Sequence, residues 1–219
     1  MRNYFKFIAY LSVLVSVSIA HAGSYEDYFA AVKKDDPAAI TELLQRGFDP
    51  NTPSPDGQHA LYLSLRDGAT KVAQALVAWP ATQVDGRNSH DETPLMMAAL
   101  KGHAEIARRL VARDADVNKP GWAPLHYAAT GGHLAIMALL LEHHAFIDAE
   151  SPNGTTPLMM AAHYGTPDAV KLLLDAGADT AMKNQLGLTA IDFAKRANRP
   201  DAAELIAQHI RSQQPRGKW

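Results

Sequence analysis

The chain has 219 residues, with 21 Lys and Arg against 23 Asp and Glu, which gives a formal net charge of −2. This near-balance argues against a nucleic-acid binder that relies on bulk positive charge. The absence of cysteine excludes disulfide scaffolds, cysteine nucleophiles, Cys-based metal sites and a bacterial lipoprotein anchor. A content of 47% hydrophobic and 20% charged residues is typical of an ordinary folded chain.

The first 22 residues have the pattern of an export signal. Arg2 and Lys6 form a basic start, an apolar run extends over residues 7–20, and Ala20-His21-Ala22 is the small-x-small pattern that a signal peptidase reads. A run of about 14 residues is shorter than the roughly 20 that a spanning helix needs, so a permanent anchor is the weaker alternative. We expect cleavage between Ala22 and Gly23, no membrane anchor after cleavage, and a periplasmic protein, with secretion as the alternative.

The rest of the chain repeats itself at a nearly constant interval, which is the signature of a repeat architecture. The spacings between the apolar anchors that mark equivalent positions are 34, 30, 33 and 33. These anchors are Leu61, Leu95, Leu125, Leu158 and Ile191. A residue suited to a helix end follows each anchor seven positions later; these residues are Gly68, Gly102, Gly132, Gly165 and Asn198.

Each repeat is predicted to be a pair of short helices and a projecting turn. In the third repeat, Thr93 can cap a helix and Pro94 suits its first position. Gly102 can end this helix in a left-handed conformation. Residues 105–112 form a second amphipathic run, and residues 114–118 form a polar loop. Two such helices cannot bury both apolar faces alone, so the repeats must stack.

The repeated segments resemble the ankyrin repeat family. Residues 93–103, 123–133 and 156–165 are similar to its Thr-Pro-Leu-His-x-Ala-Ala-x-x-Gly-His core, and residues 172–179 to the end of its second helix. The resemblance runs from Tyr25 to Ile210 and implies an all-α solenoid with hairpin loops along one edge and a concave, protein-binding face. We expect a single domain over 23–210 with about six repeats, at 25–51, 52–85, 88–118, 119–149, 150–183 and 184–210.

Two internal repeats depart from the pattern. Trp79-Pro80 stands where a glycine would end the second helix of its repeat, and the following loop is one residue longer than the period. Between Asn118 and Leu125 three residues are missing, so residues 119–122 replace a full hairpin and the row of tips should have a gap. Ala123 also lacks the hydroxyl that caps the equivalent helices.

The two end repeats have features of capping repeats. Residues 25–51 keep the helix pair but lack the Thr-Pro start. In the last repeat Thr189 and Asp192 have capping-box spacing, so the carboxylate can reach back to the helix start. We expect residues 211–219, which include three basic residues, to form a flexible tail.

Motifs of catalysis were not found. The chain has no phosphate-binding loop, no H-E-x-x-H helix, no nucleophile elbow, no G-x-G-x-x-G and no EF-hand spacing. A solenoid also lacks a deep enclosed cavity. We therefore predict a chain that is not an enzyme and that has no cofactor and no catalytic or metal site.

The ten histidines leave histidine-based metal buffering as a further alternative. On the resemblance, His103, His126 and His133 hydrogen-bond backbone groups between repeats. His143-His144 end a second helix, where a protonated imidazole is favourable. Asn153-Gly154-Thr155 matches a glycosylation acceptor, but Asn-Gly is also what a tight turn demands.

The resemblance places hairpin tips and exposed first-helix ends on the concave face. The candidate partner-binding residues at these positions are Arg66, Asp67, His90, Glu92, Leu100, Lys101, Trp122, Thr130, Asn153, His163, Tyr164 and Arg196. Trp and Tyr beside basic residues are typical of interface hot spots. Two interpretations of Trp122 stay open: it contacts a partner, or it fills the gap of the short hairpin with Leu100 packed against it.

We therefore predict a non-catalytic protein-protein interaction module of the cell envelope. It would bind an unidentified protein partner, would not bind nucleic acid, and would be a monomer on its own. A secreted effector directed at a host is the alternative.

Overall fold

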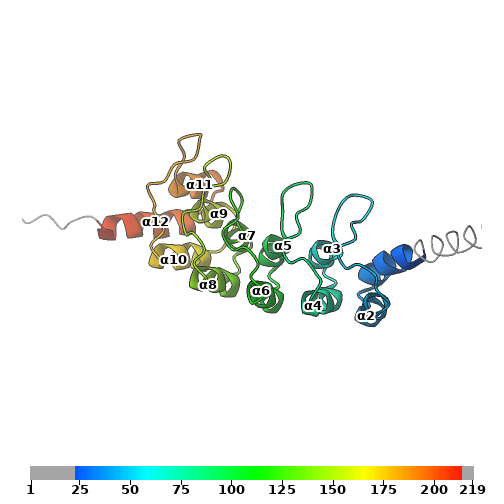
Figure 1. Cartoon of the computed structure of the whole chain (residues 1–219). Coiled ribbons are helices and arrows are strands. Elements are labelled where there is room, and N and C mark those ends of the chain that lie inside the picture. Colours follow the sequence, from blue (N-terminus) through cyan, green and yellow to red (C-terminus); the bar gives the residue numbers. More distant parts are fainter. Residues whose placement is uncertain (1–22, 214–219) are drawn as a thin grey trace, which may run out of the picture. The chain divides into compact units, whose positions relative to one another are not determined.

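A computed structural model describes residues 23–213 of the chain (Figure 1). These residues are all-α, and apart from an isolated β-bridge between Pro53 and His59 they contain no extended pairing. The export signal predicted for residues 1–22, with Ala22 of its cleavage site, lies outside the described residues. Within the described range no helix has both the length and the apolarity to cross a membrane.

The chain divides into two compact parts between Gln83 and Val84, within the loop that the sequence marked as unusual. The single domain predicted for 23–210 stays a prediction. In the N-terminal part residues 23–34 are helical, followed by α2 (Pro37–Gln45), α3 (Ala60–Asp67) and α4 (Thr70–Ala78). The C-terminal part contains α5 (Pro94–Lys101), α6 (Ala104–Val111), α7 (Pro124–Gly131), α8 (Leu134–Glu142), α9 (Pro157–His163), α10 (Pro167–Asp175), α11 (Ala190–Arg196) and α12 (Pro200–Gln213).

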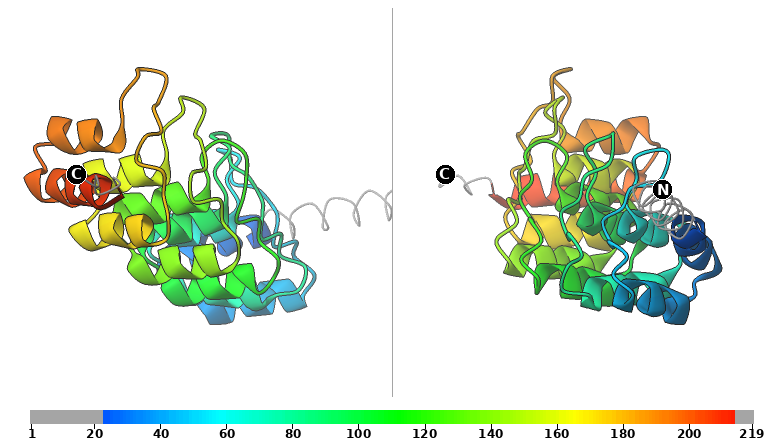
Figure 2. Two further views of the ribbon diagram at one scale, coloured as in Figure 1. Left: turned by 90° about the vertical axis from the view of Figure 1, so that its left-hand side faces the viewer. Right: turned by 45° about the vertical axis from the view of Figure 1, so that its right-hand side comes forward.

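The C-terminal part is a stack of helix pairs. First helices α5, α7, α9 and α11 lie side by side in one row, and α6, α8 and α10 in a second (Figure 1). Paired alanines let the first helices approach closely, because both alanines of each pair in α5, α7 and α9 are fully buried. The loops before α9 and α11 rise beyond the helices (Figure 2, left). The described chain is therefore an α-solenoid of about six helix pairs, as predicted.

The first helices start as the Thr-Pro pattern predicts. The hydroxyl oxygen of Thr93 accepts a hydrogen bond from the Met96 N–H at 3.3 Å, and that of Thr156 from the Met159 N–H at 3.4 Å. Each Met side chain makes the reciprocal hydrogen bond: its Sδ accepts from the N–H of the cap residue, at 3.2 Å for Met96 and 3.4 Å for Met159. Ala123 has no side-chain cap, as expected.

The glycines that end the first helices serve two different purposes. Gly102 has φ 77°, the left-handed conformation that was predicted for it. Gly165 is not left-handed, and α9 already ends at His163, with Tyr164 as its C-cap. A Cβ at Gly165 would lie 2.4 Å from the carbonyl oxygen of Ala129 in α7. Gly165 is therefore needed for close packing of two repeats rather than for backbone conformation.

Acidic and amide side chains join each loop to the backbone of the next repeat. The Asp116 N–H donates to the Asp85 carboxylate at 3.0 Å, and the Asp179 N–H to that of Asp148 at 3.0 Å. Asn118 makes the equivalent contact in the intervening repeat, accepting from a backbone N–H at 2.7 Å. Burial raises the pKa of both Asp85 and Asp148 above the ordinary aspartate value.

The C-terminal helix is longer than predicted. Residues 211–213, expected to belong to a flexible tail, continue α12 to Gln213. Arg211 holds this last turn by donating from Nη2 to Glu204 Oε1 at 2.7 Å. This salt bridge stabilises the last turn because it ties the end of the helix to a residue two turns earlier. The rest of the predicted tail, residues 214–219, lies outside the described residues.

Candidate functional site

Two adjoining hollows lie between the first helices and the loops of the C-terminal part. The first, about 260 Å³, is lined by Leu100, Trp122, His126, Tyr127, Thr130 and Met160. The second, about 310 Å³, is lined by Trp122, Asn153, Thr155, Met160, His163, Tyr164, Asn184, Leu186, Leu188, Phe193 and Arg196. Trp122 and Met160 border both. We call the two hollows together the groove, the first the Tyr127 hollow and the second the Arg196 hollow.

The shortened loop brings Trp122 to the centre of the groove. Its indole is half-buried and meets the His126 ring edge-on, with centroids 5.2 Å apart. Leu100 lines the same hollow. Both interpretations from the sequence therefore have a basis: Trp122 covers part of the space of the missing hairpin, yet it keeps a surface facing each hollow.

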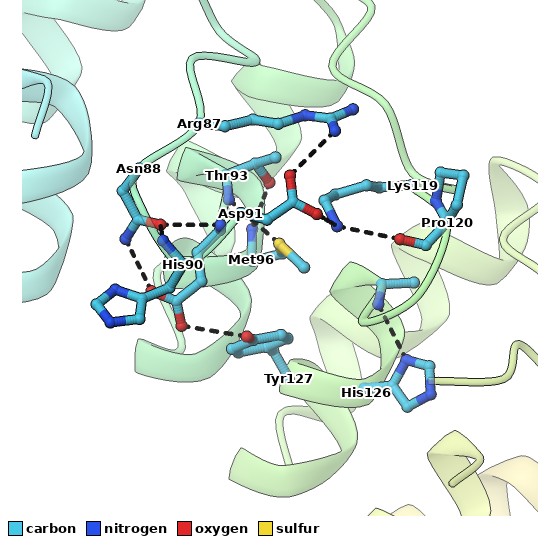
Figure 3. Close-up of polar contacts among 12 residues, drawn as sticks. Arg87, Asn88, His90, Asp91, Thr93, Met96, Lys119, Pro120, His126 and Tyr127 are labelled. Carbon is cyan, nitrogen blue, oxygen red and sulfur yellow. Dashed lines mark hydrogen bonds and ion pairs between the residues drawn. The ribbon is translucent and has the colours of Figure 1, made fainter. Parts of the chain in front are cut away.

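His126 forms the floor beneath Trp122 and joins two repeats. Its Nδ1 accepts from the Ala123 N–H at 3.1 Å (Figure 3). Its Nε2–H therefore donates to the Thr155 carbonyl oxygen, at 2.9 Å. The ring is fully buried, and burial lowers the pKa of His126 below its ordinary value. Its predicted role in the framework is confirmed, and His133 has the same role, since its ring nitrogen bonds the Leu100 carbonyl oxygen at 3.1 Å.

Tyr127 is held in position by the preceding tip. Its hydroxyl donates to Glu92 Oε1 at 3.1 Å, and Glu92 Oε2 accepts from the Asn88 side-chain amide at 2.9 Å (Figure 3). The Asn88 oxygen in turn accepts from the backbone N–H groups of His90 and Glu92. Glu92, predicted to contact a partner, therefore orients an aromatic wall of the groove.

Where the full hairpin is missing, a buried lysine connects the short loop to the preceding tip. Lys119 is only 4% exposed, and its ammonium forms an ion pair with Asp91 in the preceding tip (Figure 3). It also donates to the Pro120 carbonyl oxygen at 3.0 Å. Arg87 contacts the other Asp91 oxygen at 3.0 Å. These two cations hold the pKa of Asp91 below its usual value, with the Lys119 hydrogen bond as the main cause.

The far wall of the groove is aromatic and cationic. His163 lies between Tyr164 and Phe193, with ring centroids 4.1 and 6.0 Å away. Tyr164 is 60% exposed, so much of its side chain is accessible to a binding partner. Arg196, also exposed, ends α11 at the edge of the Arg196 hollow.

The groove contains seven of the twelve predicted contact residues. They are Leu100, Trp122, Thr130, Asn153, His163, Tyr164 and Arg196. Two others, His90 and Glu92, belong to the tip that holds Tyr127, and Lys101 is exposed at the end of α5. Arg66 and Asp67 lie in the N-terminal part, where they pair with each other at 2.6 Å.

Sequence reasoning missed several residues of the groove. Tyr127, Met160 and Phe193 line it but were not among the candidates. They occupy the fourth position of α7, α9 and α11 and recur at the same interval as the apolar anchors, so the period itself could have found them. Three further residues that were not predicted, Asn184, Leu186 and Leu188, belong to the tip before α11.

The tip at Asn153 is a tight turn, as its sequence favoured. The Asn153 side-chain oxygen accepts from the Ser151 hydroxyl at 2.6 Å and from the Thr155 N–H at 3.3 Å, and Gly154 has φ 74°. Among residues 23–213 no three His, Cys, Asp or Glu side chains gather as a metal site would require. His143 and His144 end α8, and the His144 carbonyl oxygen accepts from the Asn118 side chain.

Comparison with known proteins supports the repeat assignment. The family model "Ankyrin repeats (3 copies)" matches residues 28–120, 82–151 and 125–215. The solved ankyrin repeat domain of human ASB11 superposes with a TM-score of 0.73 at 28% identity, covering 82% of this chain and 81% of that one.

Curated relatives match over a smaller share of their own length. Protein fem-1 homolog A-like of Mus musculus is 38% identical over 99 residues, which is 44% of this chain and 15% of the relative. Neurogenic locus notch homolog protein 1 of Xenopus tropicalis is 32% identical over 126 residues, which is 56% of this chain and 5% of the relative. This chain therefore spans only a small fraction of these larger proteins. With family matches that together extend from residue 28 to residue 215, the chain belongs to the ankyrin repeat family.

Proposed function

We propose that this chain is a non-catalytic module that binds a partner protein through the groove and the neighbouring loop tips. The observation that carries the proposal is the groove itself. Two adjoining hollows, about 260 and 310 Å³, are walled by Trp122, Tyr127, Tyr164 and Phe193. Aromatic side chains of this kind are the anchors of protein interfaces. Ankyrin repeat domains typically serve in protein-protein interaction and are not catalytic.

The proposed place of action is the cell envelope. The pattern of residues 1–22 supports export to the periplasm, and a secreted effector directed at a host protein is the alternative. Fractionation of the native cells separates the two. A periplasmic protein is released by osmotic shock, whereas an effector accumulates in the medium.

Affinity capture from osmotic-shock fluid tests the binding role. The bait is the chain from Gly23, and the test variant combines Trp122→Ala with Tyr164→Ala. We expect the wild type to retain a protein that the double variant loses. Phe146→Ala is the matched control, because Phe146 is an aromatic residue of the same part that is 66% exposed and lies outside the groove. A captured protein that the double variant retains as strongly as the control does would place the binding surface elsewhere.

A further inference from the structure

We propose that the groove binds an extended acidic peptide, with one apolar side chain in the Tyr127 hollow and a carboxylate of the same segment paired with Arg196. This inference rests on the proposed function and specifies the chemistry of the partner. The occupant is a segment of another protein that carries Leu, or a residue of similar size, near an Asp or Glu.

The Tyr127 hollow is suited to an apolar side chain. Leu100, Tyr127 and Met160 provide apolar surface, and Trp122 closes one side. The two polar rings that could compete are already bonded: Tyr127 to Glu92 and His126 to backbone groups on both sides. Because these bonds fix the walls before a ligand arrives, little side-chain freedom is lost on binding.

The Arg196 hollow is suited to an anion. Neither hollow is lined by an Asp or Glu, whereas Arg196 and His163 both line the second. Within the described residues Arg196 takes part in no ion pair. Asp192, one turn before it, interacts with Arg196 through charge but not through a hydrogen bond, and its Oδ2 accepts from the N–H and hydroxyl of Thr189, at 3.0 and 2.7 Å. The guanidinium is therefore available to a carboxylate, which it can bind through two parallel hydrogen bonds.

The two hollows adjoin at Trp122 and Met160, which favours an extended chain. In an extended peptide, side chains two residues apart project from the same face. A segment that crosses Trp122 can therefore place an apolar residue in one hollow and an acidic residue in the next.

The test uses fluorescein-labelled, C-terminally amidated peptides of Gly and Ser that carry one Leu and one Glu. In this panel the number of residues between Leu and Glu varies from one to four, and each peptide has matched Gln and Lys versions. Binding to the chain from Gly23 is measured by fluorescence anisotropy. We expect at least one spacing at which the Glu peptide binds about fivefold tighter than the Gln peptide, the upper range for a partly exposed ion pair.

Variants of the groove assign the effect. Arg196→Gln should remove the preference for Glu over Gln and leave the affinity for the Gln peptide unchanged. Trp122→Ala should weaken all peptides by roughly thirtyfold, as expected for an interface anchor. Lys195→Gln is the matched control, because Lys195 is the exposed neighbour of Arg196 and does not line the groove.

The outcomes separate this inference from the proposed function. Peptides that bind in a Trp122-dependent manner without preference for Glu would overturn the acidic specificity and leave a protein-binding groove. A preference for Glu that survives Arg196→Gln would overturn the assigned anion site. If no peptide of the panel binds, the extended-peptide mode is wrong, while capture of a folded partner that depends on Trp122 and Tyr164 would still support the proposed function.

Discussion

The loops before α11 and before α7 connect equivalent elements by different means. The loop before α11 is stabilised by one of its own side chains. Asn184 is buried, and its side-chain oxygen accepts from the N–H groups of Leu186 and Leu188, both at 3.0 Å. The loop before α7 is three residues shorter and has no such side chain. Lys119 instead reaches back to Asp91 in the preceding tip.

The comparison of these two loops shows how a solenoid can accommodate a shortened repeat. The full tip has its own internal acceptor, Asn184, and is joined to the preceding tip by neutral hydrogen bonds, in which the N–H and the side-chain amide of Gln185 donate to the carbonyl oxygens of Asn153 and Pro152 at 2.9 and 2.8 Å. The short tip depends on an ion pair to the previous repeat, and the space above it becomes available to Trp122. The groove and the unusual ion pair both lie at this shortened loop. The predictions below test this relation between the two loops.

The largest effect is expected from Asp91→Ala. This change leaves the buried Lys119 ammonium with the Pro120 carbonyl oxygen as its partner, and an uncompensated buried charge is strongly destabilising. Lys119→Met removes the charge and keeps most of the side chain, so it should lower the Tm less. Thermal denaturation of both variants checks the order. Equal falls in Tm would mean that the ion pair is not what holds the short loop.

Asn184→Leu should cost about 2 to 3 kcal/mol of stability, since two backbone N–H groups of the full tip lose their acceptor. Urea denaturation measures the change. Asn184→Asp keeps an oxygen at the same place and serves as the control, with an expected loss well below that of the Leu variant. A stable Leu variant would show that water replaces the side chain.

His126 should make the stability of the chain sensitive to pH. Because burial lowers its pKa in the folded state, the unfolded chain binds more protons below the unfolded-state pKa of about 6.5. Stability should therefore be full at pH 7.5 and fall as the pH decreases to 5. His126→Met introduces the residue that Met96 and Met159 provide at the equivalent position of α5 and α9. This variant loses the hydrogen bond to Thr155 and should cost about 1 to 2 kcal/mol of stability at pH 7.5.

The decisive measurement is urea denaturation of wild type and His126→Met at pH 7.5 and pH 5. The variant should lose less stability between the two values than the wild type does. If wild type and variant lose the same free energy of unfolding between pH 7.5 and pH 5, groups other than His126 cause the acid sensitivity.

The smallest effect concerns the missing cap. Ala123→Thr should stabilise the chain by about 1 kcal/mol, because it restores the hydroxyl that caps the equivalent helices. Thr156→Ala, the reverse change at a full tip, should destabilise it by about the same amount. A Thr at 123 without benefit would indicate that His126 already provides the cap that matters.

Much of the fold could be predicted because local signals agree with the repeat. Thr93 and Thr156 cap their helices, Gly102 ends its helix, and Asp192 reaches back to Thr189. Each of these depends on residues that are close together in the sequence. The end of the C-terminal helix, residues 211–213, was not predicted because this turn is held by Arg211 and an acidic residue two turns earlier, a side-chain contact that composition does not indicate.

The groove was predicted only in part, since its chemistry depends on contacts between repeats. Lys119 would normally be assigned to the surface, and only the fold reveals that Asp91, in the preceding tip, is its partner. Tyr127 occupies a position that reads as core in a helical pattern. Met160 and Phe193 follow it at the repeat period, but only the structure shows that this row of side chains lines the groove.

The aspartate carboxylates that accept hydrogen bonds from the next repeat determine how stability is shared along the chain. The Asp148 carboxylate is partly withdrawn from water, and its backbone partner is the N–H of Asp179 in the following repeat. Asp85 and Asp116 have the same relation. Each of these bonds can exist only when both neighbouring repeats are folded. These bonds therefore contribute to the coupling energy between nearest neighbours, so a destabilising change in one repeat should be transmitted mainly to the repeats on either side of it.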